Sequence, residues 1–158
     1  EMCIRDRFDT FTGFPSVHEK DNLHCDVIRT GGLATTDSYD TYLERVMQFQ
    51  ESDNPLSHIC KFEVRKGDAT VEIDRYLDKH PETIVALAYF DFDVYEPTRK
   101  CLQAIRSRLV KGSVLAFDEL NDPDSPGETA ALMEVFGLPN VRLKRYRYAS
   151  RVSYFVVE

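Results

Sequence analysis

The chain has 158 residues, of which 42% are hydrophobic and 30% are charged, as in an ordinary globular domain. Its 27 acidic and 20 basic side chains give a net charge of −7, which argues against a protein that binds nucleic-acid phosphates through Lys and Arg. No run reaches the roughly 20 apolar residues of a membrane span. We therefore expect a cytoplasmic protein that binds a small molecule, with neither nucleic acid nor a membrane as a partner.

The N-terminal residues 1–7 (EMCIRDR) resemble the in-frame translation of a mosaic-end adapter used in transposase-based sequencing libraries. We expect residues 1–7 to be a non-native scar and exclude them from fold reasoning. Residues 8–158 are then expected to be a fragment, a partial domain that begins upstream of Phe8.

The first half of the chain predicts two strands and two helices. Residue 8 is predicted to end a strand, and residues 16–36 form a polar stretch typical of a loop or mobile lid. Helical spacing of apolar residues predicts a helix over 39–50, capped by Asp37 or Ser38, whose apolar stripe should pack in the core. A strand is expected over 58–65 and a helix over 70–79, which stops before a proline.

The second half continues the alternation of strands and helices. The unbroken apolar run 84–90 is typical of a strand buried on both faces of a parallel sheet. A helix over 98–109, a strand over 113–117, a helix over 128–136 and a hairpin of strands 141–148 and 152–157 follow. This order predicts an α/β fold, a doubly wound sheet with a C-terminal antiparallel hairpin.

Both central apolar runs end on acidic residues. Asp91 and Asp93 follow the run 84–90, and Asp118 and Glu119 follow the run 113–117. Because open α/β sheets bind ligands beyond the carboxyl ends of their strands, we expect these carboxylates to meet in one crevice. Such an oxygen-rich cluster suits Mg²⁺. The alternative is that Asp93 caps the next helix and Glu119 is simply solvated.

Three segments, 8–15 (FDTFTGFP), 90–98 (FDFDVYEPT) and 111–119 (KGSVLAFDE), resemble the macrocin O-methyltransferase group of class I S-adenosylmethionine-dependent methyltransferases. The similarity in order and spacing extends over about residues 8–136, and the segment 90–98 is its most specific part. The resemblance implies a Rossmann-like methyltransferase sheet and S-adenosylmethionine as cofactor. The implied reaction is O-methylation of a small-molecule hydroxyl, such as that of a sugar or natural product.

The resemblance also implies roles for individual residues. Asp91 and Asp118 match catalytic positions, and Asp91, Asp118 and Glu119 match the Mg²⁺ ligands of metal-dependent relatives. The family more often has Asp-Asp before an aromatic residue where this chain has Asp118-Glu119-Leu120, which makes Glu119 an atypical ligand. The positions that match the cofactor site are Asp9, Thr10 and Phe11 on the ribose side, Gly67, Asp68 and Ala69 on the adenine side, and Asp91.

The family's first strand and its Gly-rich turn are expected before Phe8, and the chain does not contain them. Their absence should open one edge of the strand 84–90 and favour aggregation. We therefore expect the chain alone to be poorly soluble, inactive and unable to bind S-adenosylmethionine. A homo-oligomer is compatible with the sequence.

Two other functions remain open at this point. A glycosyltransferase that holds a nucleotide sugar through Asp-x-Asp and a divalent ion would use Asp91 and Asp93, although it leaves Asp9 unexplained. A methyltransferase-like domain kept for binding alone is the other. We interpret His18 and His24 as solvated loop residues, the basic hairpin as a solubilising edge or a contact to an anionic acceptor, and residues 126–129 as a helix start.

Overall fold

The computed structural model describes residues 5–158, and the expected scar at residues 1–4 lies outside them. Residues 5–7, also assigned to the scar, belong to a strand, so excluding them from the fold was wrong, whatever their origin. In chain order, the elements are β1 (Arg5–Asp9), α1 (Tyr39–Ser52), β2 (Phe62–Lys66), α2 (Ala69–Lys79), β3 (Val85–Phe90), α3 (Tyr95–Ile105), the 3-10 turn Arg106–Arg108, β4 (Leu109–Phe117), α4 (Gly127–Val135), the 3-10 turn Leu138–Asn140, β5 (Lys144–Arg145) and β6 (Ser153–Val156).

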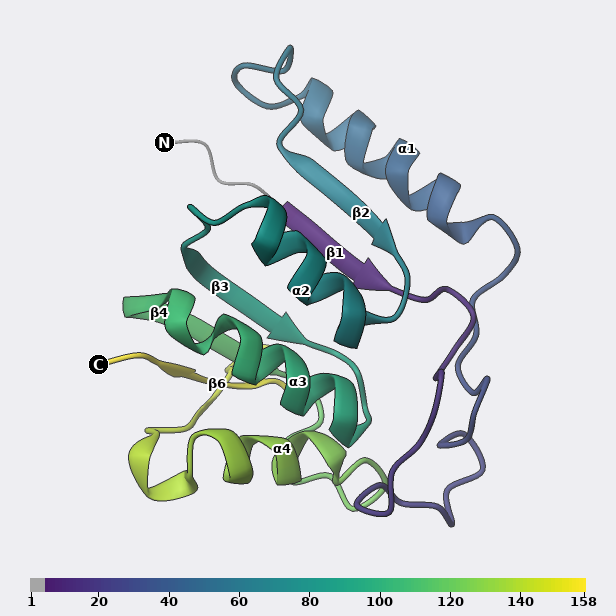
Figure 1. The fold of residues 1–158 in the computed structure, drawn as a ribbon, viewed down its shortest axis with the longest axis vertical. Helices are drawn as coiled ribbons and strands as arrows, with labels where there is room; N and C mark the ends of the chain where they lie inside the picture. The colour runs from purple at the N-terminus through teal and green to yellow at the C-terminus, as the bar shows by residue number, and fades with distance from the viewer. Residues whose placement is uncertain (1–4) are drawn as a thin grey trace.

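The strands form two separate sheets. The parallel strands β1 and β2 make a two-stranded sheet, and the second sheet has the order β3-β4-β6-β5, with β3 and β4 parallel and β6 antiparallel to β4. In Figure 1, β1 and β3 face each other across the gap between the two sheets. Within residues 5–158, neither strand has a hydrogen-bonded neighbour on that side. The expected open edge of this central strand is therefore present.

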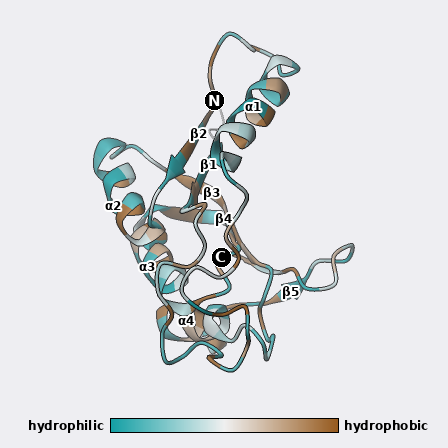
Figure 2. Ribbon diagram, turned by 90° about the vertical axis from the view of Figure 1, so that its right-hand side faces the viewer, coloured by the Kyte–Doolittle hydropathy of each residue, from teal (hydrophilic) through white to brown (hydrophobic). Residues whose placement is uncertain are grey.

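Helices α2, α3 and α4 cover one side of the strands, and Figure 2 shows α1 on the opposite side from α2. The core lies under α3 and α4, where Phe90 stacks on Phe117 at 5.0 Å between ring centroids. Leu102, Leu115 and Leu132 are fully buried there. Alternate residues of parallel strands point to opposite faces, so these side chains define the covered face of the larger sheet.

The opposite face of the larger sheet is largely open in the described part of the chain. Leu87 and Tyr89 of β3 are 65% and 52% exposed. The expectation that the run 84–90 is buried on both faces was therefore wrong. The same holds for the apolar stripe of α1, where Met47 is buried but Phe49 is 72% exposed. Periodicity identified the helix correctly, but no described element covers most of its stripe.

The other differences concern element ends. Helix α3 begins at Tyr95 instead of residue 98, and Leu109 opens strand β4 instead of closing the helix. The two strands of the C-terminal hairpin are shorter than expected, and only two residues of β5 pair with β6. Among residues 5–158, no helix combines the length and the apolar character needed to cross a membrane.

Candidate functional site

A cavity of about 290 Å³ opens where the carboxyl ends of β1, β2 and β3 meet. It therefore spans the junction between the two sheets. Five of the seven residues expected at the cofactor line its wall, from three different strand ends: Asp9, Thr10, Asp68, Ala69 and Asp91. The expected Phe11 and Gly67 are not among the residues that line the cavity. Residues of the long loop after β1 close the cavity from the far side, among them Gly13, Phe14, Gly32 and Leu33.

The turn after β1 is built around Asp9. The Asp9 carboxylate accepts a hydrogen bond from the Phe11 backbone N–H at 2.6 Å, and its carbonyl accepts one from the Gly67 N–H at 2.9 Å. Phe11 is buried and has a positive φ of 59°, a conformation that costs energy for a non-glycine residue. The turn thereby aims Asp9 and Thr10 into the cavity and fixes β1 against the end of β2.

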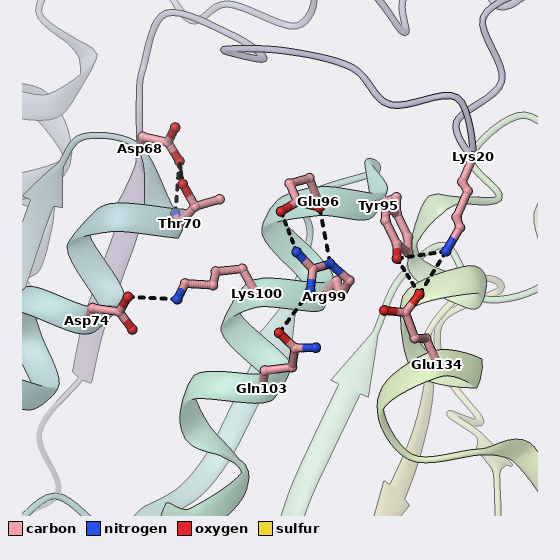
Figure 3. A network of polar contacts seen from close by, with 10 residues as sticks. All are labelled: Lys20, Asp68, Thr70, Asp74, Tyr95, Glu96, Arg99, Lys100, Gln103 and Glu134. Carbon is pink, nitrogen blue, oxygen red and sulfur yellow. Dashed lines mark hydrogen bonds and ion pairs between the residues drawn. The ribbon is translucent and has the colours of Figure 1, made fainter.

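Asp68 begins helix α2 beside this turn. Its carboxylate accepts hydrogen bonds from the Thr70 N–H and the Thr70 hydroxyl at 2.9 and 2.7 Å, which makes Asp68 the N-cap of the helix (Figure 3). Oδ1 of Asp68 thus serves the helix, and the residue also lines the cavity.

The loop of residues 10–38 contains no helix or strand, yet a buried carboxylate ties it to the start of helix α3. Asp21 accepts hydrogen bonds from the His18 N–H and from the Tyr95 N–H, both at 2.7 Å. Tyr95 is the first residue of α3, so Asp21 caps that helix from 74 residues away. The loop was expected to be free or lid-like, and no local pattern around Asp21 indicates its long-range partner.

A second contact holds the same loop at the surface. The Lys20 ammonium donates to the Tyr95 hydroxyl at 2.8 Å and to the Glu134 carboxylate at 2.7 Å, joining the loop to α3 and α4 (Figure 3). The His18 ring lies 4.7 Å from the Tyr95 ring, while His24 is exposed. His18 is thus a packing residue at this anchor, and the expectation that it is solvated was wrong.

The first acidic strand end follows β3. Asp91 is exposed and lines the cavity, and Asp93 lines it as well. Asp93 does not cap α3, contrary to one expectation: the residue at the N-cap position is Val94, and the side-chain cap of the Tyr95 N–H comes from Asp21. Asp93 instead has a positive φ of 58°, and burial, with the nearby charge of Asp91, raises its pKa.

The second acidic strand end follows β4. Burial, and then the negative charge of Asp91, raises the pKa of Asp118 to about 7. Two carboxylates repel unless a proton or a cation lies between them. Asp118 Oδ1 is buried and has no donor among the described residues, and the same is true of Glu119 Oε2.

Glu119 points to different partners. Its carboxylate accepts a hydrogen bond from Arg151 at 2.7 Å, and the same guanidinium lies 3.1 Å from Asp122. Arg151 thereby joins the C-terminal hairpin to the loop after β4. In this arrangement the sequence expectation that Glu119 faces a shared ion with Asp91 and Asp118 has no support.

Glu128 is a further buried carboxylate near the two strand ends. It is fully buried in the first turn of α4, and burial, followed by the charge of Asp118, raises its pKa to about 8. Residues 126–129 do begin a helix, as expected. A glutamate at that position is typical of helix starts, so its burial could not be read from the sequence.

The fit of a divalent ion is partial. The Asp91 and Asp118 carboxylates are suitable hard oxygen ligands, and the buried Asp118 Oδ1 has no hydrogen-bond partner among the described residues. Glu119 is held by Arg151, however, and residues 5–158 contain no group of three or more His, Cys, Asp or Glu side chains arranged for a metal. Of the three expected ligands, Asp91 and Asp118 therefore remain candidates, and the described residues supply no third ligand beside them.

Comparison with known proteins gives structural matches. No protein-family model matches the chain, and no curated protein matches it. The crystal structure of CalS11, a calicheamicin methyltransferase, is 39% identical with a TM-score of 0.90 and is matched over 96% of this chain and 59% of its own length. An apo structure of CalS11, described as a TDP-rhamnose 3'-O-methyltransferase of calicheamicin biosynthesis, is 34% identical with a TM-score of 0.78, over 96% and 56%.

The O-methyltransferase NovP has the same fold at 17% identity, with a TM-score of 0.65 over 98% of this chain and 60% of its own. The chain thus spans a little more than half the length of each of these enzymes. The expected doubly wound, Rossmann-like arrangement is confirmed by these matches.

Proposed function

We propose that this chain belongs to the class I methyltransferases and is part of an S-adenosylmethionine-dependent O-methyltransferase that modifies a hydroxyl of a sugar-containing small molecule. The family is supported by the CalS11 match, and the acceptor class by the TDP-rhamnose named for that enzyme. The single observation that carries the proposal is the cavity at the sheet junction, because it gathers acidic residues from three strand ends.

Asp9 and Asp68 are the groups suited to the cofactor's polar edges. Both present carboxylates on the cavity wall while backbone contacts fix their positions. A carboxylate has two acceptor oxygens, so it can accept a hydrogen bond from each of a pair of ribose hydroxyls. When bound, S-adenosylmethionine supplies an electrophilic methyl group on its sulfonium.

Asp91 and Asp118 are suited to handle the acceptor's proton. As the acceptor oxygen gains the methyl group, its hydroxyl proton must leave, and a base works best when its pKa lies near the working pH. The Asp118 carboxyl, with its pKa raised to about 7, meets this condition. If Mg²⁺ is bound, Asp91 and Asp118 would hold it, and the ion would lower the pKa of the acceptor hydroxyl.

The test is a methyl-transfer assay with the full-length protein, S-adenosylmethionine carrying a labelled methyl group, and TDP-rhamnose as the probe acceptor. We expect labelled product with the native protein. The Asp118→Asn variant should lose at least about 100-fold in kcat, because it removes the base without changing the shape of the site. The Asp26→Asn variant is the matched control, since Asp26 is exposed in the loop.

The metal is tested in the same assay by comparing EDTA with added Mg²⁺. A rate restored by Mg²⁺ supports the ion, and a rate that EDTA leaves unchanged supports proton transfer to Asp118 alone. Binding of the cofactor without any transfer to sugar acceptors would contradict the proposed acceptor class. Transfer of a sugar from a nucleotide sugar would contradict the methyltransferase proposal.

A further inference from the structure

We propose that Glu128 is a positioning residue that clamps the two acidic strand ends together, so that Asp91 and Asp118 face one another. The proposal rests on the proposed function, because it concerns the geometry of the same site. It assigns a role to residues 126–129, which the cofactor and acceptor roles leave unexplained.

The clamp consists of two hydrogen bonds from one side chain. The Phe92 N–H donates to Glu128 Oε1 at 3.1 Å, and the Glu119 N–H donates to Glu128 Oε2 at 3.3 Å. Phe92 directly follows Asp91, and Glu119 directly follows Asp118. Each carboxylate oxygen therefore binds the backbone next to one of the two acids, and the side chain joins the end of β3 to the end of β4.

Only a two-oxygen acceptor of this length makes both bonds. A glutamine has one acceptor oxygen, and its NH2 group would face the second N–H as donor against donor. An aspartate is one methylene shorter and would not reach both strand ends. A buried backbone N–H without an acceptor costs free energy, so losing either bond should let one strand end relax toward water.

The neighbours of Glu128 bring the helix close enough for this contact. A Cβ on Gly127 would lie 2.4 Å from the Tyr95 nitrogen and 2.8 Å from the Val94 carbonyl carbon, so only glycine permits this approach to the start of α3. On the other side, the Thr129 hydroxyl accepts a hydrogen bond from the Asn121 N–H at 2.8 Å. The first turn of α4 thus contacts the loops after both strands, with Glu128 between them.

This arrangement explains why a carboxylate is buried beside other carboxylates. Placing Glu128 near Asp118 is unfavourable in charge, and a fully buried acid carries a desolvation cost. Removing the two backbone donors from water without an acceptor would also be costly. The carboxylate offsets that cost and, at the same time, fixes the spacing of the two acids.

The test measures amide hydrogen exchange of Phe92 and Glu119 by NMR in the full-length protein, together with kcat and KM for methyl transfer. In the native protein both amides should be protected. In Glu128→Gln we expect at least about tenfold faster exchange at one of the two amides, the size of a lost buried hydrogen bond. We also expect kcat to fall about tenfold or more, with the KM for S-adenosylmethionine changed less than threefold.

The matched control is Ser113→Ala. Ser113, in the middle of β4, is buried and also bridges two backbone groups, but these belong to Val85 and Val110, near the starts of β3 and β4 and away from the acidic strand ends. It should lose stability without a selective change at Phe92, Glu119 or kcat. Unprotected amides at Phe92 and Glu119 in the native protein would overturn the clamp, whether or not Glu128→Gln folds. So would a folded Glu128→Gln variant with unchanged protection, or an equal fall in kcat in Ser113→Ala.

The two proposals can fail separately. If the native protein transfers no methyl group to any sugar acceptor, the proposed function fails. The exchange rates of the two amides still test the proposed role of Glu128, because these rates depend on the hydrogen bonds and not on turnover.

Discussion

The two sheets of this molecule differ sharply in how well they are packed. The sheet β3-β4-β6-β5 has a continuous core with α3 and α4, in which Leu102, Leu115 and Leu132 are fully buried. The pair β1-β2 is packed more thinly, and α1 beside it buries Met47 while leaving Phe49 mostly exposed. The acids suited to proton transfer lie in the first region, and Asp9 lies in the second.

The difference indicates that the two halves of the site are held by different means. Asp118 is fixed by buried groups of its own region, including Glu128. Asp9 depends on a turn whose strand has one free edge among the described residues. Changes in the packed region should therefore alter stability and turnover, whereas changes around α1 should have little effect on the stability of this chain.

The largest effect is expected from Gly127→Ala. The added methyl group would lie too close to backbone atoms of Val94 and Tyr95. Backbone atoms cannot move aside as the end of a flexible side chain can. Overpacking of this kind costs about 1–3 kcal/mol and should displace the first turn of α4. Urea unfolding at equilibrium measures the loss. A variant as stable as the native protein would mean that the two helix starts are not in close contact.

Asp21→Ala should come next. It removes the cap of α3 and the acceptor of the His18 N–H, and a lost buried acceptor costs about 1–3 kcal/mol. Limited proteolysis should then cut the loop of residues 12–36 faster. Asp26→Ala is the control in the same loop, because Asp26 is exposed. Equal cleavage of the two variants would show that Asp21 does not anchor the loop.

The pH dependence of stability should reveal Asp118. Its folded-state pKa of about 7 lies above the unfolded value of about 3.9, so the folded protein holds this proton more tightly. The free energy of unfolding should therefore fall as the pH rises from about 4 to about 7. Thermal unfolding across this range should show a smaller fall in Asp118→Asn. An identical slope in both proteins would contradict the burial of this carboxyl.

Leu87→Lys tests the open edge of β3. Leu87 is 65% exposed on a strand that pairs on one side only within residues 5–158, and such apolar edges favour association between chains. We expect less self-association of the 158-residue chain by analytical ultracentrifugation, with little change in stability. Val71→Lys is the matched control, because Val71 is 45% exposed on helix α2, and it should leave association unchanged.

The smallest effect is expected from Phe49→Ser. A side chain that is 72% exposed contributes little to the core, so the free energy of unfolding of the chain should change by less than about 0.5 kcal/mol. A cost of about 2 kcal/mol or more in urea unfolding would show that α1 is covered, and would remove the contrast between the two regions.

Local patterns in the sequence predicted most of the elements. Apolar periodicity identified α1 and α2, and the short apolar runs identified β3 and β4, because these signals depend on neighbouring residues. The same reasoning placed Asp91 and Asp118 at adjacent strand ends. It overestimated the burial of Leu87 and Phe49, because an apolar residue indicates a preference for the core and does not show whether another element covers it.

The sequence by itself determined the alternation of strands and helices and the acidic ends of two parallel strands, through spacing that acts over a few residues. Tertiary structure alone decided that Asp21 caps a helix 74 residues away, that Glu119 pairs with Arg151 and that Glu128 joins both strand ends. These contacts join groups distant in the chain. They depend on which donors folding removes from water, and local sequence patterns do not predict which donors these are.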